Sequence, residues 1–181
     1  RSLTDLPILA KEFIVSEEQI LEARSAGADA ILLIARVLNE EEILQLSRMT
    51  VDLGMAVLFE IHSREEIVKI PKMSRDQIVI GINNRNVDTL HVDLQNTEDI
   101  APFVREKFPE HLLISESGIS HCSDVERISR VVDGFLVGTA FLKAGDPGRK
   151  ISDLFQGVGA HCYAPCGGTG KRKLCGSCSS H

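Results

Sequence analysis

Two neighbouring apolar runs in the second half of the chain end in groups suited to phosphate binding. Glu116, Ser117 and Gly118 follow one run, and Gly138 and Thr139 follow the next. If both runs are parallel strands of a barrel, the loops after them lie side by side and turn backbone N–H groups toward an anion. Glycine at such positions lets a phosphate approach the backbone closely. The pattern predicts a site for a phosphorylated small molecule.

Three earlier apolar runs end in groups capable of acid–base chemistry, namely Lys11, Glu60 and Asn83. Burial at the mouth of a barrel would lower the pKa of a lysine, whereas burial and a facing lysine act in opposite directions on the pKa of a glutamate. Asn83 supplies a neutral hydrogen-bonding group, and Arg85 supplies a guanidinium fork that matches a carboxylate. The simpler alternatives are a solvated Lys11, a structural ion pair at Glu60 and an ordinary polar turn at 83–86.

Arg36 and the histidines in the body of the chain are weaker candidates. Arg36 follows the apolar run 31–34 and is a candidate second cation for the substrate. His62, His91, His111 and His121 fall at loop or helix boundaries without metal-ligand spacing, and we expect them at the surface.

These side chains can form one site only in a fold that places the ends of the strands close together. The runs expected to form strands are 7–11, 30–34, 56–61, 78–83, 111–116 and 134–138. Most are apolar throughout, as is typical of parallel strands that are covered on both faces. Helices are expected after the capping residues Ser16, Asn39 and Ser63, and over 97–107 and 123–131.

Six successive strand–helix units leave two architectures, an open doubly wound sheet or a closed barrel. A doubly wound sheet concentrates its functional groups at one switch point. Here such groups follow nearly every strand, which favours the barrel. A full barrel has eight units, so this chain is short by two.

The overall composition excludes several classes of partner. The net charge of −6 argues against nucleic acid and against an anionic membrane surface. No apolar run approaches the roughly 20 residues of a membrane span, and the first residues lack a signal-peptide core. We therefore expect a cytoplasmic protein.

The end of the chain differs from the rest, and we divide the chain into a partial barrel at 1–156 and a flexible, Cys- and Gly-rich tail at 157–181. Two cysteine pairs in the tail, Cys162 with Cys166 and Cys175 with Cys178, have spacings that would allow a tetrahedral zinc site. An unstructured, oxidation-prone extension is the alternative, and it is the one we adopt, with no metal site expected elsewhere.

Several segments resemble the indole-3-glycerol phosphate synthase family: 9–15, 27–34, 80–85, 115–119 and 135–139. The resemblance covers 5–155 and implies a TIM (β/α)8 barrel, of which this chain would carry six βα units, strands 3–8. Nothing in the chain matches the family's first strand, with its Glu-x-Lys motif followed by Ser-Pro. An upstream segment or a second chain would then supply strands 1–2.

The resemblance also implies an activity in tryptophan biosynthesis. The family closes the ring of 1-(2-carboxyphenylamino)-1-deoxyribulose 5-phosphate, with decarboxylation and dehydration, and uses no metal or organic cofactor. The implied roles are a general acid at Lys11, its acid/base partner for dehydration at Glu60, an orienting group at Asn83, a carboxylate contact at Arg85, the pocket floor at Glu116 and Ser117, and phosphate binding at Gly118, Gly138 and Thr139.

Other interpretations remain open at this point. One is a non-catalytic phosphate-binding barrel fragment or scaffold with a metal-binding tail, and another is a different phosphate-binding barrel enzyme of the same pathway. The absence of the first-strand residues puts the activity of the isolated chain in question. The expected partners are a phosphorylated small molecule and the missing strands, with neither nucleic acid nor membrane.

Overall fold

The computed structural model describes residues 4–156. The predicted tail at 157–181, with its possible zinc ligands Cys162, Cys166, Cys175 and Cys178, lies outside these residues. The described part contains six strands: β1 (Leu9–Ala10), β2 (Ala30–Ile34), β3 (Ala56–Ile61), β4 (Ile78–Asn83), β5 (Leu112–Glu116) and β6 (Gly134–Leu136). Each lies within or closely matches a run predicted from the sequence.

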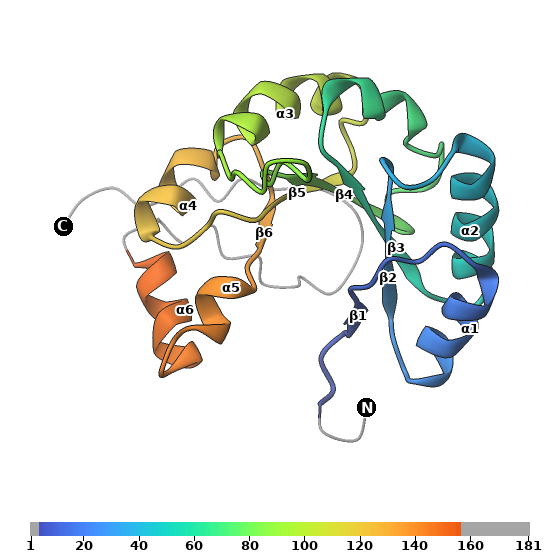
Figure 1. Ribbon diagram of the computed structural model, residues 1–181, viewed down its shortest axis with the longest axis horizontal. Coiled ribbons are helices and arrows are strands. Elements are labelled where there is room, and N and C mark those ends of the chain that lie inside the picture. Colours follow the sequence, from blue (N-terminus) through green and yellow to red (C-terminus); the bar gives the residue numbers. More distant parts are fainter. Residues whose placement is uncertain (1–3, 157–181) are drawn as a thin grey trace, which may run out of the picture.

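The six strands are all parallel and pair in sequential order, β1-β2-β3-β4-β5-β6. A doubly wound sheet reverses its strand order at a switch point, so sequential order identifies part of a barrel wall. Figure 1 shows this curved sheet with α1 to α4 along its outer side. In the described part of the chain, β1 and β6 are the two ends of the sheet.

The helices are α1 (Glu17–Ser25), α2 (Glu40–Asp52), η1 (Arg64–Lys69), α3 (Gln95–Lys107), α4 (Cys122–Ile128), α5 (Thr139–Leu142) and α6 (Pro147–Phe155). The capping boxes predicted at Ser16 and Asn39 are present. The segment after Ser63 forms a short 3₁₀ helix that ends at Lys69, and Ile70 is extended because Pro71 disfavours helical backbone at the residue before it.

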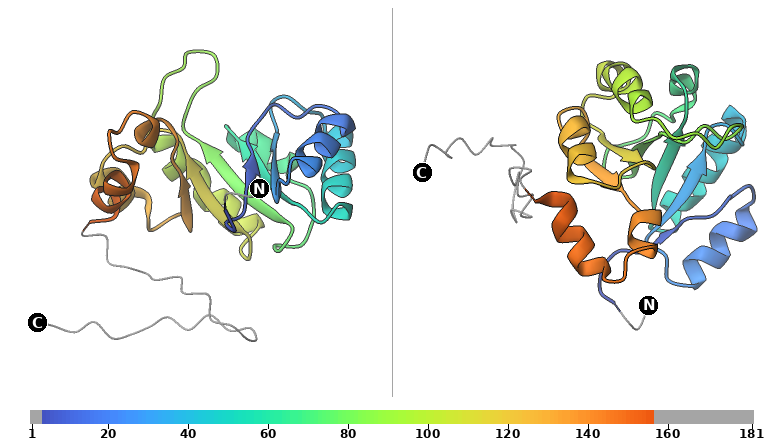
Figure 2. Two further views of the ribbon diagram at one scale, coloured as in Figure 1. Left: turned by 90° about the horizontal axis from the view of Figure 1, so that it is seen from below. Right: turned by 60° about the vertical axis from the view of Figure 1, so that its left-hand side comes forward.

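The last two helices were not foreseen. Asp146 caps α6 by accepting a hydrogen bond from the Arg149 N–H at 3.0 Å, with Pro147 at the first helical position. Leu154 of α6 packs with Val125 and Ile128 of α4 in a separate cluster. The side views of Figure 2 show α5 and α6 following β6 as the last elements. Over the described residues, every helix is too short or too polar to cross a membrane.

The two faces of the sheet bury different sets of side chains. Ile31, Leu33, Phe59, Ile80 and Leu113 face the helices and belong to the main core. Each such fully buried side chain contributes about 1.5–3 kcal/mol. A smaller cluster fills the inner face, with members from all six strands: Leu9, Leu32, Ile34, Leu58, Val79, Ile114 and Leu136.

The inner face also determines where the functional groups point. Successive side chains of a strand alternate between its faces. Lys11, Glu60 and Glu116 each come two residues after a member of the inner cluster, namely Leu9, Leu58 and Ile114. The sheet register aligns Glu60 with Gly81, and Glu116 with Asn83. The strand ends therefore bring these polar groups into one layer.

Candidate active site

A cleft of about 680 Å³ opens at the carboxyl ends of the strands. Most residues singled out from the sequence line it: Lys11, Asn83, Arg85, Ser117, Gly118, Gly138 and Thr139. Lys143, which was not foreseen, lines it as well. Three cations and no carboxylate therefore face the cleft among the described residues, which favours an anionic substrate.

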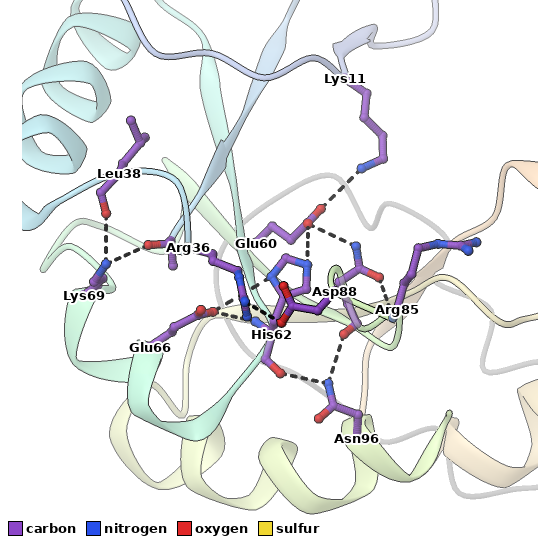
Figure 3. A network of polar contacts seen from close by, with 12 residues as sticks. Lys11, Arg36, Leu38, Glu60, His62, Glu66, Lys69, Arg85, Asp88 and Asn96 are labelled. Atoms are coloured by element: carbon purple, nitrogen blue, oxygen red, sulfur yellow. Dashed lines mark hydrogen bonds and ion pairs between the residues drawn. The ribbon is translucent and has the colours of Figure 1, made fainter. Parts of the chain in front are cut away.

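Lys11 connects two buried carboxylates next to the cleft. Its Nζ lies 3.3 Å from Glu60 Oε2 and 3.3 Å from Glu116 Oε2. The Lys11 side chain is 41% exposed, whereas those of Glu60 and Glu116 are 4% and 1% exposed. Lys11 thus faces both solvent and the buried pair. Figure 3 shows it reaching toward Glu60.

Glu60 is held as an anion by its neighbours. Burial raises the pKa of this carboxyl, but close contacts from His62 and Asn83 and the charge of Lys11 outweigh burial and lower it to about 2. Asn83 Nδ2 donates to Glu60 Oε1 at 3.0 Å, and His62 Nε2 lies 3.2 Å from the same oxygen. Glu60 is therefore ionised at neutral pH.

Glu116 is shifted in the opposite direction. Burial, together with the charge of Glu60, raises the pKa of its carboxyl to about 7, and Lys11 only partly opposes this. Glu116 Oε1 is buried and has no hydrogen-bond partner among the described residues. Room for this oxygen exists only because residue 81 is glycine, since a Cβ there would lie 2.0 Å from it. Sequence reasoning missed this role of Gly81.

The two carboxylates therefore differ in protonation near neutral pH. Environments that push the pKa values of a carboxyl pair apart mark one group as a base and the other as an acid. Here Glu60 can accept a proton and Glu116 can hold one, and Lys11 contacts both. The arrangement can deliver protons to a substrate in the cleft and remove them from it.

A buried amide supports the turn after β5. Asn84 Nδ2 donates to Ser115 Oγ at 2.8 Å, to Glu116 O at 3.0 Å and to Ser117 O at 3.1 Å. Asn84 Oδ1 accepts from the Thr97 N–H and hydroxyl at 3.1 and 2.8 Å. The amide thereby fixes the backbone that carries Glu116. No role for Asn84 could be predicted from the sequence, because a second polar residue after a strand is typical of any turn.

The predicted phosphate-binding residues occupy two loops of different character. Ser117 and Gly118 both have left-handed backbone, with φ of 65° and 83°. A Cβ at Gly118 would lie 2.5 Å from Val92 Cγ1, whereas a Cβ at Gly138 would meet no protein atom within 4 Å. Gly118 is therefore required by its conformation and packing. The space beside Gly138 and Thr139 is open to a ligand.

The two arginines singled out from the sequence differ in position. Arg85 lines the cleft, and its backbone N–H donates to Asn83 Oδ1 at 3.0 Å. Arg36 is not among the lining residues. Its guanidinium pairs with Asp88, in the loop after β4, at 2.7 Å. The expectation that Arg36 contacts the substrate is therefore not supported, because Asp88 holds its charge outside the cleft.

The expectation of surface histidines is wrong for His62. Its side chain is 6% exposed and lies between Glu60 and Glu66 (Figure 3). The missed signal is its spacing, since His62 comes two residues after Glu60 and shares its side of the strand. His111 is partly buried, with Nε2 3.0 Å from Met73 O. The expectation is confirmed for the two remaining histidines, His91 and His121.

Comparison with known proteins adds independent findings. The profile of the family described as indole-3-glycerol phosphate synthase matches residues 1–154. A relative of that name from Kineococcus radiotolerans is 40% identical over 163 residues, which cover 89% of this chain and 57% of the relative. Another, from Lachnospira eligens, is 38% identical over 157 residues, covering 85% and 58%. The chain thus spans less than two thirds of the length of these relatives.

Solved structures resemble the fold at low sequence identity. The 3-hexulose-6-phosphate synthase of Salmonella typhimurium has a TM-score of 0.62 at 15% identity, covering 83% of this chain and 72% of that structure. The triosephosphate isomerase of Bartonella henselae has a TM-score of 0.61 at 13% identity, covering 84% and 78%. At such identities the likeness shows the fold alone. It confirms the predicted TIM-barrel class.

Proposed function

Because the chain belongs to the indole-3-glycerol phosphate synthase family, we propose that it carries most of the active site of a carbon–carbon lyase of tryptophan biosynthesis. The substrate is 1-(2-carboxyphenylamino)-1-deoxyribulose 5-phosphate, and the product is indole-3-glycerol phosphate. The observation that carries this proposal is the contact of Lys11 with both Glu60 and Glu116 beside an open, cationic cleft. The family match and this geometry support it together.

The cleft has a place for each charged part of this substrate. The phosphate binds against Gly138 and Thr139, where the cleft is open, with Gly118 also in the lining and Lys143 as an additional cation. Arg85 faces the carboxylate, since a guanidinium fork matches its two oxygens. The ketone then lies near Lys11, between the two anion-binding ends.

The reaction needs proton transfers at two stages. In ring closure, the ring carbon that bears the carboxylate bonds to the ketone carbon, while Lys11 Nζ donates a proton to the ketone oxygen. Loss of carbon dioxide then restores the aromatic ring. In dehydration, the new hydroxyl leaves as water with a proton from Lys11. Glu60 accepts the proton that leaves the adjacent ring carbon, and the double bond of the new ring forms between the two carbons. Between the two stages Glu116 returns a proton to Lys11 across their 3.3 Å contact, so that Lys11 can act as the acid a second time.

This chemistry consists of proton transfers and bond rearrangement within the substrate. It requires neither an electron carrier nor a Lewis acid, so we assign no cofactor to it. Asn83 donates to Glu60 at 3.0 Å and also lines the cleft, and in this scheme it orients both the base and the intermediate. Ser117 forms part of the floor beside it. We place the protein in the cytoplasm.

The ends of the sheet supply the remaining part of the proposal. Leu6 and Phe13, which flank β1, are 72% and 71% exposed, and Leu142, soon after β6, is 89% exposed. These apolar groups accompany the outer edges of β1 and β6, which no other strand of residues 4–156 pairs with. Strands 1–2 of the barrel cover them, supplied by an upstream segment or by a second chain.

A non-catalytic scaffold is the main competing function. Burying two carboxylates with one lysine carries a large desolvation cost, and apolar residues at those positions would stabilise a scaffold better. The retained buried pair therefore favours the enzyme.

The test measures indole fluorescence with the anthranilate-derived substrate. The chain is assayed alone and joined in cis to the first two strand–helix units of a family member. Turnover by the joined protein, nearly abolished by Lys11→Ala, is expected. Substrate binding without any indole formation, with Lys11 intact, would instead identify the scaffold.

A further inference from the structure

The geometry points to His62 as a positioning residue that keeps Glu60 in place as an anionic base while Lys11 exchanges its proton. Only the catalytic consequence of this inference rests on the proposed function. His62 follows the end of β3 and has no role in the proposed mechanism. It is nevertheless one of the few buried titratable groups in the described part of the chain.

The ring of His62 lies between two carboxylates. Nε2 is 3.2 Å from Glu60 Oε1, and Nδ1 is 3.9 Å from Glu66 Oε2. Neither nitrogen has a hydrogen-bond partner among the described residues, so the two contacts become ion pairs when the ring carries an additional proton. An imidazole that faces an acceptor from each nitrogen can donate from both only as the imidazolium.

The backbone of His62 is fixed from both sides. Its N–H donates to Glu66 Oε2 at 2.7 Å, in the 3₁₀ helix η1. Its carbonyl accepts from Asn96 Nδ2 of α3 at 3.1 Å, and the same amide group donates to Asn83 O at 2.9 Å. Asn96 therefore ties the ends of β3 and β4 together. These bonds fix the backbone position from which the ring extends toward Glu60.

A second cation beside Glu60 has a specific use. Groups from three other strands also face Glu60: Lys11 after β1, Asn83 in β4 and Glu116 in β5. Lys11 is the only one of these with a positive charge, and as a general acid it loses that charge during turnover. Burial would then favour proton uptake by Glu60. In its protonated form His62 places a second positive charge 3.2 Å from Glu60 Oε1, so Glu60 stays a base while Lys11 is neutral.

Two substitutions of His62 distinguish the effects of its N–H donor and its charge from the effect of its packing. His62→Leu removes both the donor and the charge. His62→Gln keeps a neutral N–H donor near the position of Nε2. The control is His111→Gln, because His111 is also partly buried but bonds to Met73 O just before β5 begins, at the amino ends of the strands. Thermal unfolding of all three variants reports on stability alone.

The first measurement follows the Glu60 carboxyl by carbon NMR with isotope-labelled glutamate in the full chain without substrate, using Glu60→Gln to assign the signal. The wild type and His111→Gln should keep Glu60 ionised down to about pH 4. In His62→Leu the carboxyl should take up its proton at clearly higher pH, and in His62→Gln at an intermediate pH. Should the leucine variant fail to fold, the glutamine variant decides. Titration of Glu60 as in the wild type, in whichever variant decides, would overturn the inference.

The second measurement is the kinetics of the joined, active protein. His62→Leu should lower kcat by about 10- to 100-fold, within the range of acid–base effects, with little change in KM and partial recovery in His62→Gln. Equal kcat values for the leucine and glutamine variants would reduce His62 to a packing role. If the Glu60 titration shifts as expected but no protein forms indole, the proposed function fails while the positioning of Glu60 by His62 stands.

Discussion

At one end of the cleft, which we term the carboxylate end, Lys11, Glu60 and Glu116 come from three strands and hold one another by side-chain contacts. At the other, the glycine end, Gly118, Gly138 and Thr139 present the backbone of two loops. The carboxylates are 4% and 1% exposed, whereas the residues of the glycine end are at the surface.

The difference follows from what each end has to do. Burial amplifies charge interactions and can shift the pKa of a carboxyl, so acid–base groups belong on rigid, buried strand ends. A phosphate remains charged throughout the reaction and needs only donors within reach, which exposed loops supply. Changes at the carboxylate end should therefore alter the chemistry, and changes at the glycine end should alter binding.

The largest effect is expected for Lys11→Ala. Removing the general acid should lower kcat in the joined protein by about 10²- to 10⁴-fold. Lys72→Ala is the matched control, since Lys72 is exposed and outside the cleft lining. Near-normal indole formation by the Lys11 variant would show that the carboxylate end takes no part in catalysis.

Gly81→Ala tests whether the position of Glu116 matters. The added Cβ would lie 2.0 Å from Glu116 Oε1 and 3.2 Å from Leu58 Cδ1, so the carboxyl must move. We expect a clear fall in kcat and a loss of about 1–3 kcal/mol in stability, as in other overpacked sites. Gly145→Ala, where nothing lies within 4 Å of the new Cβ, should change neither quantity. Wild-type kcat in the Gly81 variant would contradict this account of Glu116.

The pH dependence of stability should report on Glu116. Its folded-state pKa is raised from 4.5 to about 7, so its favourable contribution is complete below pH 4.5 and is lost as the pH rises through 7. Between about pH 5 and 8, urea unfolding should show the wild type losing about 1–3 kcal/mol, since one pKa unit corresponds to about 1.4 kcal/mol. Glu116→Gln should lack this loss. An equal loss in both proteins would assign it to other groups.

The smallest effects are expected at the glycine end. Gly138→Ala places a methyl group in open space, so it should raise KM a few-fold with stability unchanged within about 0.5 kcal/mol. Gly118→Ala should instead reduce stability, because φ is 83° and Val92 lies 2.5 Å from the new Cβ. Comparing KM with the unfolding midpoint for the two variants separates ligand contact from backbone strain. If the two variants changed KM and the unfolding midpoint by the same amounts, the two loops would not differ in their roles.

Much of the fold was predictable because parallel strands and helix caps leave local signals. The apolar runs gave all six strands, and the capping boxes at Ser16 and Asn39 gave two helix starts. The 3₁₀ helix η1 was expected to be an ordinary helix, since the effect of Pro71 acts against an otherwise good capping signal. The short helix α5 has too few residues to show a period.

The site was predictable where function follows strand ends, and not where it depends on packing. Lys11, Glu60 and Asn83 met as expected because parallel strands end at one edge of a barrel. The contributions of Gly81, Asn84 and His62 arise from contacts across neighbouring elements. Such contacts have no period in the sequence, so only three-dimensional structure reveals them.

The opposite protonation of the two buried carboxylates is the centre of this account, and infrared spectroscopy of the full chain tests it directly. A protonated carboxyl absorbs apart from carboxylates, and the difference between the wild type and Glu116→Gln isolates residue 116. At about pH 6 we predict a protonated-carboxyl band in the wild type that fades as the pH rises beyond about 7 and is absent from the variant. A Glu116 band that has already vanished at about pH 5, as for an ordinary glutamate, would contradict it.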